Sequence, residues 1–156
     1  MYRNIMVPLD GSELAECVLP HVEAIAKERQ AVVEVVSVVE PIEIPTRGGI
    51  ALSGDDLKQI ELQAKHEAEN YLGGVVNRLE HAGVKVKSKL IMGKAAESLS
   101  DYAQSGNFDL IIMATHGRSG ISRWIRGSVA DRILQSSSVP VLLVRAPGCI
   151  PPPETQ

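Results

Sequence analysis

The 156-residue chain is predicted to form one α/β domain, a doubly wound sandwich in which a mostly parallel, five-stranded sheet carries helices on both faces. Two observations predict this class. Five strand-like segments, four of them short apolar runs typical of strands buried on both faces, alternate with four segments of helical periodicity. The composition, with 44% hydrophobic and 22% charged residues, is that of an ordinary globular protein whose length suffices to bury a core.

The N-terminal part of the chain predicts a buried strand, a polar turn and a helix. Residues 4–9 are mainly apolar, and Pro8, which has no N–H for a sheet, places the end of the strand near it. Asp10-Gly11-Ser12 has turn chemistry, and Ser12 is suited to begin the helix. The apolar side of that one helix comprises Leu14, Val18, Val22 and Ile25.

The next segments predict a strand, an irregular stretch and a long helix. Residues 31–39 are rich in β-branched side chains and end at Glu40-Pro41. Residues 41–55 contain Pro and Gly without periodicity, and we interpret them as a loop or lid. Residues 56–79 have the apolar spacing of an amphipathic helix, in which Gly73-Gly74 marks a kink or a close packing contact.

The next strand is predicted from alternation of apolar and charged residues, and the next helix from helical spacing. Residues 84–91 alternate valine with lysine, which predicts a half-exposed strand at an edge of the sheet. Gly93 precedes a third helix that turns Ala96, Leu99 and Ala103 inward. Near the C-terminus the composition changes, because residues 146–156 hold four of the nine prolines. We therefore place the domain at residues 1–146 and expect a disordered, proline-rich tail at residues 147–156.

A glycine-punctuated loop lies between the last two predicted strands, residues 108–113 and 139–144. It leads to Ser128, in capping position for a helix with apolar spacing over residues 129–134. A helix start offers unpaired N–H groups and the positive end of a dipole, and glycine lets the backbone approach a phosphate closely. We therefore expect a nucleotide phosphate between Gly117 and Gly127-Ser128.

The topology points to the same place. In doubly wound sheets, ligands bind outside the carboxyl ends of the strands where the winding reverses. Asp10 follows the first strand and Met113-Ala114 ends the fourth. In a sheet of order 3-2-1-4-5 these two ends flank the reversal. Asp10 also has a simpler interpretation, because an Asp at this position often accepts the N–H groups of its own turn.

These residues identify a resemblance to the universal stress protein family over nearly the whole chain. The matching pieces are residues 7–12, 109–113 and 139–145, together with the family's phosphate loop Gly-x2-Gly-x9-Gly-Ser/Thr, present here as Ala114-x2-Gly117-x9-Gly127-Ser128. The resemblance implies a parallel sheet of order 3-2-1-4-5, the adenine nucleotide alpha hydrolase-like fold. In the nucleotide-binding branch of the family it also implies one ATP per subunit, with Mg²⁺ carried by the phosphates.

The resemblance further implies the roles of individual residues. Asp10, beside Pro8 and Leu9, would hold the ribose or the adenine edge, and the backbone of Val38 would meet the adenine. Met113 and Ala114 would lie against the ribose. Backbone groups would hold the phosphates, with the Ser128 hydroxyl adding one bond, at Gly117, Arg118, Gly127, Ser128, Val129 and Ala130.

Ala114 occupies the position of the first glycine of the motif. If its φ is strand-like, Ala fits without strain; if its φ is positive, Ala costs about 1–2 kcal/mol. This departure keeps an alternative open, a nucleotide-free dimeric interaction protein. For either function the resemblance implies a homodimer, or a higher oligomer, formed by antiparallel pairing of the last strand at Val141, Leu142, Leu143 and Val144.

Several enzyme classes lack parts that they would need. The chain has no GxxxxGK[ST] loop of the P-loop NTPases, and its third predicted strand ends in Ile91-Met92-Gly93 rather than in the phosphoacceptor Asp of receiver domains. Residues 8–12 contain neither the His-x-Gly-His nor the Ser-Gly-Gly-x-Asp-Ser signature of related adenylate-forming enzymes. Because no nucleophile and base are paired, we expect a binding protein without catalytic residues, with a slow ATPase as a further alternative.

Charge and hydropathy restrict the partners. A net charge of −3 argues against a nucleic-acid surface, which needs clustered Lys and Arg. The N-terminus has no charged segment followed by a long apolar one, and no window is apolar over the length of a membrane span. We therefore expect a soluble, cytoplasmic protein with no membrane partner.

Overall fold

The computed structural model describes residues 1–43, 52–115 and 128–145. The described elements are β1 (Asn4–Pro8), α1 (Glu13–Glu16), α2 (Leu19–Arg29), β2 (Val32–Val39), α3 (Gly54–His81), β3 (Lys85–Met92), α4 (Ala95–Ser105), β4 (Leu110–Thr115), α5 (Ser128–Ser136) and β5 (Val141–Arg145). The strands form one sheet of order β3-β2-β1-β4-β5, and every neighbouring pair is parallel. The predicted fold class and strand order are confirmed.

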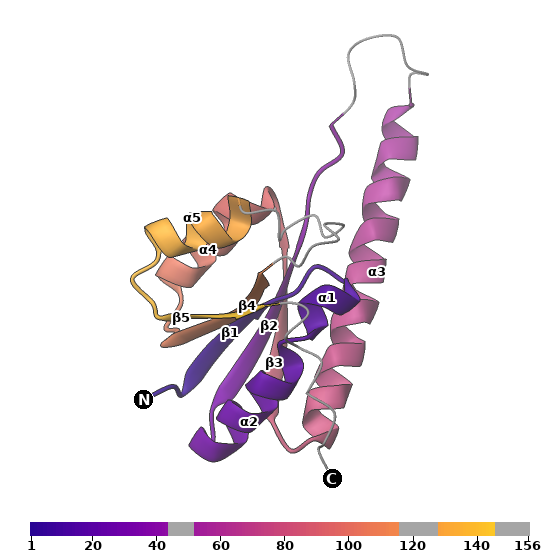
Figure 1. The fold of residues 1–156 in the computed structure, drawn as a ribbon. Helices are drawn as coiled ribbons and strands as arrows, with labels where there is room; N and C mark the ends of the chain where they lie inside the picture. The colour runs from indigo at the N-terminus through magenta and orange to yellow at the C-terminus, as the bar shows by residue number, and fades with distance from the viewer. Residues whose placement is uncertain (44–51, 116–127, 146–156) are drawn as a thin grey trace.

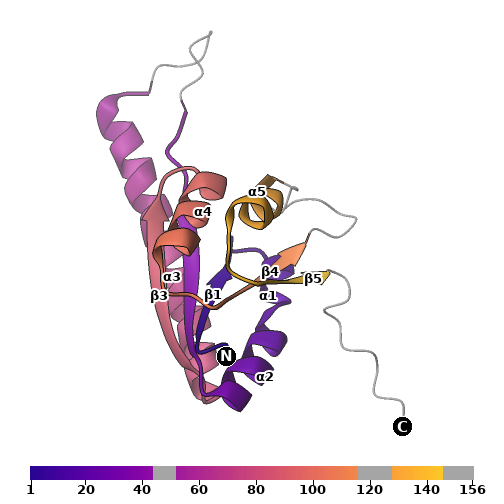
Figure 2. The same ribbon diagram turned by 90° about the vertical axis from the view of Figure 1, so that its left-hand side faces the viewer.

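Helices cover both faces of the sheet, as the two views show (Figures 1 and 2). On one face α1, α2 and α3 enclose a core that includes Leu19, Val22 and Leu72. On the other face α4 and α5 enclose a second core, to which Leu99 and Ile133 belong. Successive side chains of a strand point to opposite faces, so each of β1, β2 and β4 contributes to both cores and is buried except at its ends.

The single helix expected after Ser12 is two helices. Ser12 caps the first, because its hydroxyl oxygen accepts the Ala15 N–H at 3.1 Å, as its position predicted. The chain then breaks between Glu16 and Leu19, and Pro20 lies in the first turn of α2. Proline has no N–H to bond the carbonyl four residues earlier, but it is well suited to the first turn of a new helix. The break therefore follows from Pro20.

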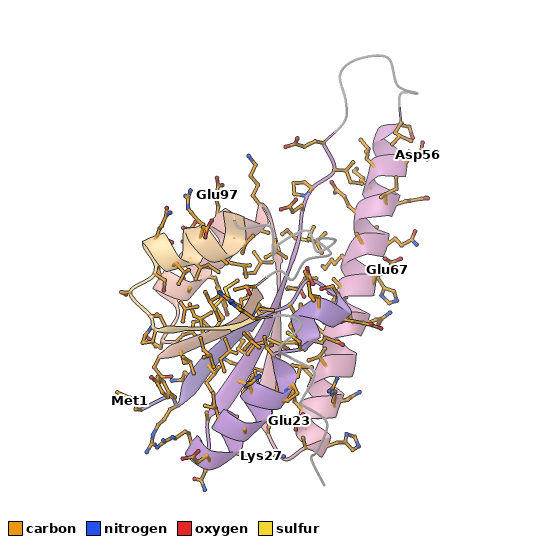
Figure 3. All side chains as sticks on the ribbon, viewed as in Figure 1. Met1, Glu23, Lys27, Asp56, Glu67 and Glu97 are labelled. Carbon is orange, nitrogen blue, oxygen red and sulfur yellow. The ribbon has the colours of Figure 1, made fainter. Side chains whose placement is uncertain are left out.

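The long helix α3 begins at Gly54, two residues before the predicted start. Ser53 and Asp56 form a reciprocal capping box there: the Asp56 N–H donates to Ser53 Oγ and the Ser53 N–H to Asp56 Oδ2, both at 3.2 Å. Residues 54 and 55, expected in the irregular stretch 41–55, are thus helical, and residues 44–51 lie outside the described residues. The half of α3 near Asp56 extends beyond the sheet (Figure 3).

The helix α3 runs through Gly73 and Gly74 without interruption. A Cβ added at either position would meet no atom within 4 Å. The predicted close packing contact at this glycine pair is therefore wrong.

The two edge strands differ in character. The strand β3 pairs only with β2 and exposes Lys85, Lys87 and Lys89, which confirms the prediction of an edge strand. At the opposite edge β5 pairs with β4 and contains the residues predicted to form the dimer interface, Val141, Leu142, Leu143 and Val144. This strand begins at Val141 and not, as predicted, at residue 139.

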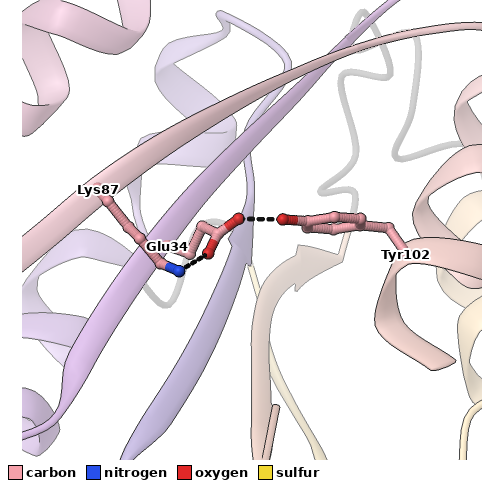
Figure 4. A network of polar contacts seen from close by, with 3 residues as sticks. All are labelled: Glu34, Lys87 and Tyr102. Carbon is pink, nitrogen blue, oxygen red and sulfur yellow. Dashed lines mark hydrogen bonds and ion pairs between the residues drawn. The ribbon is translucent and has the colours of Figure 1, made fainter. Parts of the chain in front are cut away.

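A polar network around the buried Glu34 carboxylate links β2 and β3 to α4 (Figure 4). The Glu34 carboxylate, whose side chain is only 6% exposed, lies 2.6 Å from the Lys87 ammonium. Its other oxygen accepts a hydrogen bond from the Tyr102 hydroxyl. Both carboxylate oxygens thus have partners, which is what burial of a charge requires.

No helix in the described part of the chain combines the length and the apolar character needed to cross a membrane. The predicted tail, residues 147–156, lies outside the described residues.

Candidate functional site

A cavity of about 550 Å³ lies at the carboxyl ends of β1 and β2, with α3 as its second wall. Two of the predicted ligand residues, Asp10 and Val38, line it. Its complete lining is Asp10, Gly11, Ser37, Val38, Val39, Glu40, Ile42, Ile60, Ala64, Glu67, Ala68 and Tyr71. The cavity thus includes Asp10 at the carboxyl end of β1, as the topology predicted, but its lining contains no residue of β4, the other strand at the predicted reversal.

Asp10 is held in a defined orientation by the turn that follows β1. The Ser12 N–H donates to Asp10 Oδ1 at 2.9 Å, and the Ser12 hydroxyl donates to the same oxygen at 2.5 Å. Gly11, between them, has a φ of 84°, which favours glycine. The second carboxylate oxygen, Oδ2, is buried and makes no hydrogen bond to the described residues. Asp10 thus stabilises its turn with one oxygen and leaves the other for a ligand.

Tyr71 faces the same cavity from α3. Its hydroxyl is buried near the carboxylates of Glu16 and Asp10, yet no hydrogen bond of normal length and angle joins it to any described residue. Burial first, then the charge and the close approach of the Glu16 carboxylate, and then the charge of Asp10 raise the pKa of the Tyr71 hydroxyl above its ordinary range. The hydroxyl therefore stays protonated at physiological pH.

Hydrogen bonds join the carboxyl ends of β1 and β2 beside the cavity. The Leu9 N–H donates to the Val36 carbonyl at 2.8 Å, and the Ser37 hydroxyl donates to the Leu9 carbonyl at 2.7 Å. Pro8 and Leu9, both among the predicted site residues, are buried here. They hold the end of β1, and hence Asp10, against β2.

A second cavity, of about 470 Å³, adjoins the first at Glu40, which lines both. Its lining also includes Glu43, Lys94, Glu97 and Val129, so carboxylates outnumber cationic side chains in it. Glu40 Oε1 accepts a hydrogen bond from the Ala95 N–H at 3.0 Å. The second cavity thus lies between the starts of α4 and α5.

The predicted phosphate ligands are only partly within the described residues. Gly117, Arg118 and Gly127 lie outside them. The helix α5 begins at Ser128, and Val129 and Ala130 form its first turn. Of the three, Val129 lines the second cavity.

Ala114 takes the strand-like conformation that allows alanine without strain. It lies in β4 opposite Val144, and among the described residues only Tyr2 and Gln30 combine a side chain with a positive φ. The side chains of Ala114 and Met113 are buried in the two different cores. A ligand at the end of β4 would therefore meet their backbone.

Sequence reasoning missed the contribution of α3, which supplies five residues of the first cavity: Ile60, Ala64, Glu67, Ala68 and Tyr71. The apolar spacing predicted an amphipathic helix but no ligand site, and the half of α3 near Asp56 has no buried residue. A signal was present in Tyr71, an aromatic residue with a polar tip within that stripe. Glu40 gave no signal, because its partner Ala95 is 55 residues away.

The described residues contain no group of three or more His, Cys, Asp or Glu side chains that could hold a metal ion. If Mg²⁺ accompanies a nucleotide, its ligands would include phosphate oxygens.

Comparison with known proteins identifies the same family from one end of the domain to the other. A model described as the universal stress protein family matches residues 1–145. The universal stress protein MJ0577 of Methanocaldococcus jannaschii is 31% identical over 155 residues, which cover 93% of this chain and 96% of that protein. The solved structure of MJ0577 superposes with a TM-score of 0.77 at 30% identity, covering 93% of this chain and 96% of that chain.

Two more distant structures share the fold and contain a nucleotide. A universal stress protein in complex with cAMP has a TM-score of 0.67 at 19% identity, and the match covers 92% of this chain and 97% of that chain. A universal stress protein family protein from Arabidopsis thaliana with AMP bound has a TM-score of 0.63 at 14% identity, covering 91% and 90% of the two chains.

Proposed function

The chain belongs to the universal stress protein family, and we propose that it is a regulatory module that binds an adenine nucleotide, ATP, with Mg²⁺ carried by the phosphates. The observation that carries the proposal is the cavity of about 550 Å³ at the carboxyl ends of β1 and β2. It is lined by Asp10 and Val38, and it contains a buried carboxylate oxygen without a partner. A buried acceptor of this kind costs free energy until a donor reaches it.

The start of α5, at the edge of the second cavity, supports a place for the phosphates. This cavity adjoins the first, and Val129 in the first turn of α5 lines it. The unpaired N–H groups and the dipole at the start of a helix favour an anion. Ala114, without a positive φ, puts no strain on the loop motif. The AMP and cAMP complexes of other family members support an adenine nucleotide as the ligand.

The first experiment is to denature freshly purified protein and identify any released nucleotide by chromatography and mass spectrometry. We expect ATP, ADP or AMP in near-stoichiometric amount. Calorimetry with Mg-ATP then compares the nucleotide-free wild type with Asp10→Ala, which should bind about ten- to a hundredfold more weakly because it loses a bond to a charged group. Asp101→Ala, the same change at an exposed position on α4, should bind like the wild type.

An empty protein that also fails to bind Mg-ATP in the calorimeter would contradict the proposal. It would favour the nucleotide-free alternative, in which the protein acts through its surfaces. Unchanged ATP affinity in Gly117→Val would refute the assignment of the phosphate loop.

We propose binding without efficient hydrolysis, since the sequence pairs no nucleophile with a base. A phosphate-release assay tests this directly. The slow ATPase alternative predicts release of phosphate that disappears in Asp10→Ala and in Gly117→Val.

We also propose a homodimer formed through β5. This strand pairs with β4 and lies at the edge of the sheet. Unpaired backbone groups at an edge readily accept another strand. A second copy of β5, antiparallel to the first, would extend the sheet across the dimer.

A further inference from the structure

Two buried polar atoms in the first cavity have no hydrogen-bond partner: Asp10 Oδ2 and the Tyr71 hydroxyl oxygen. Among the described residues they are the only buried side-chain oxygens or nitrogens in this situation. Buried polar atoms nearly always have a hydrogen-bond partner, because an unpaired one loses its hydrogen bonds to water and gains none in return. Two exceptions in one cavity indicate a shared ligand group.

The two atoms approach the cavity from opposite walls. Asp10 belongs to the turn after β1, and Tyr71 belongs to α3. They are close enough for the Asp10 charge to act on the Tyr71 hydroxyl, yet they do not bond each other. A ligand that fills this cavity meets both residues.

The chemistry of the two walls restricts that ligand group. The Asp10 carboxylate can only accept a hydrogen bond, whereas the Tyr71 hydroxyl, which stays protonated, both donates and accepts. A phosphate or carbonyl oxygen cannot donate to Asp10, and a phosphate would also be repelled by the nearby charges of Asp10 and Glu16. An ammonium or amino group could donate to both oxygens, but it would leave the Tyr71 proton without an acceptor. A hydroxyl group satisfies both walls.

We propose that Tyr71 and Asp10 together bind a hydroxyl of the nucleotide's ribose, so that this site selects ribonucleotides over deoxyribonucleotides. The inference rests on the proposed nucleotide function and adds α3 to the binding site. It places the sugar in the corner between the turn after β1 and α3. The phosphates are then directed away from Glu16, toward the start of α5.

The experiment measures the affinity of ATP, 2′-deoxy-ATP and 3′-deoxy-ATP by calorimetry for the wild type, Tyr71→Phe and Tyr102→Phe. Wild type should bind ATP about three- to tenfold more tightly than the analogue that lacks the bound hydroxyl, the worth of one hydrogen bond. Tyr71→Phe should lower the affinity for ATP by the same factor and leave the affinity for that analogue unchanged. Tyr102→Phe makes the same chemical change on the far face of the sheet, at Glu34, and should preserve the discrimination.

The stability of the free protein provides an independent readout. Because the Tyr71 hydroxyl has no partner in the free protein, Tyr71→Phe should melt at the same or a higher temperature than the wild type. A purely structural hydroxyl would instead lower the melting temperature when removed.

The outcomes separate this inference from the proposed function. If wild type binds ATP but Tyr71→Phe discriminates against the deoxy analogues as well as wild type does, the inference is overturned and a water satisfies the two atoms. Wild type that binds ATP and both analogues equally also overturns it, with nucleotide binding intact. If wild type binds no adenine nucleotide at all, the proposed function fails first and the inference fails with it.

Discussion

The Glu40 carboxylate, one residue after the end of β2, accepts a hydrogen bond from the Ala95 N–H in the first turn of α4, with oxygen and nitrogen 3.0 Å apart. The N-cap residue of α4, Lys94, makes no side-chain hydrogen bond to the helix. Glu40 therefore does the work of an N-cap from a distant strand, and its negative charge lies at the positive end of the helix dipole. Glu40 also lines both cavities, so this one side chain connects the end of β2, beside the first cavity, to the start of α4.

Removal of this cap should destabilise the protein. We expect Glu40→Ala to lower the free energy of unfolding by about 1 kcal/mol, the usual worth of a helix N-cap. Urea unfolding, monitored by circular dichroism, measures this free energy. Glu43→Ala, the same change at an exposed position three residues further on, should stay within about 0.5 kcal/mol of wild type. Equal stability of the two variants would show that the Glu40–Ala95 bond contributes nothing.

Alanine at Gly73 or Gly74 should stabilise the protein. Both glycines are exposed within α3, and a Cβ at either would meet no atom within 4 Å. Each substitution should raise the free energy of unfolding by about 0.5–1 kcal/mol, because alanine loses less backbone entropy in a helix.

The matched control for that prediction is Gly83→Ala. Its Cβ would also meet no atom within 4 Å, but its φ is 84°. The change should therefore lower the free energy of unfolding, by about 1 kcal/mol. A gain of stability at Gly83, or a loss at both Gly73 and Gly74, would contradict the conformational argument.

The contribution of Tyr102 to stability should disappear at alkaline pH. Burial, and then the hydrogen bond to Glu34 and the Glu34 charge, raise the pKa of Tyr102 from 10.0 to about 12. Because the folded pKa is the higher one, the unfolded chain loses this proton first. The stabilisation is thus complete below about pH 10 and is lost as the pH rises toward 12.

The measurement for Tyr102 is the difference in melting temperature between wild type and Tyr102→Phe, followed from neutral to strongly alkaline pH. Taking the difference cancels the titration of other groups that the two proteins share. The difference should be constant up to about pH 10 and then narrow. A difference that does not change with pH would mean that the bond to Glu34 has no influence on the ionisation of Tyr102.

Proline at Leu143 should prevent dimerisation without unfolding the monomer. The Ile111 N–H donates to the Pro140 carbonyl, and in a parallel ladder alternate residues bond the same neighbour. The backbone groups of Leu142 thus face β4, and those of Leu143 face the open edge. Leu143→Pro removes an N–H only from that edge, where proline is tolerated.

Sedimentation equilibrium measures the mass of this variant. We expect a dimer for wild type and for Leu143→Ala, which loses the same side chain but keeps the N–H. Leu143→Pro should be a folded monomer. A monomeric wild type, or a dimeric Leu143→Pro with native circular dichroism, would refute the proposed β5 interface.

Much of the fold could be predicted because its signals are local. Buried strands of a parallel sheet are apolar at consecutive positions, and helices repeat with period 3.6, so the alternation of elements and the edge character of β3 were readable residue by residue. The strand order was different, since it came from the resemblance to a family. Pro20 shows the limit of periodicity as a predictor. The apolar spacing continues across the break between α1 and α2, but the helical backbone is interrupted there.

The candidate site also contains residues that the sequence predicted and residues that it did not. Asp10 was predicted from its position at the end of a strand and Val38 from the resemblance to the family, and both line the cavity. Tyr71 was not predicted, because an aromatic residue in an apolar helical stripe is ordinarily core. Only the extension of α3 beyond the sheet turns that stripe into a cavity wall (Figure 1).

By itself, then, the sequence determined the kind of element at each position, the buried strands, and the turn that holds Asp10. The tertiary structure alone decided which distant groups meet: Glu40 with Ala95 across 55 residues, Glu34 with Tyr102 across 68 residues, and Tyr71 with Asp10 in one cavity. The physical reason is that propensity and periodicity depend on neighbours within a few turns of chain. A hydrogen bond depends on distances of about 3 Å, which only the packing of whole elements sets.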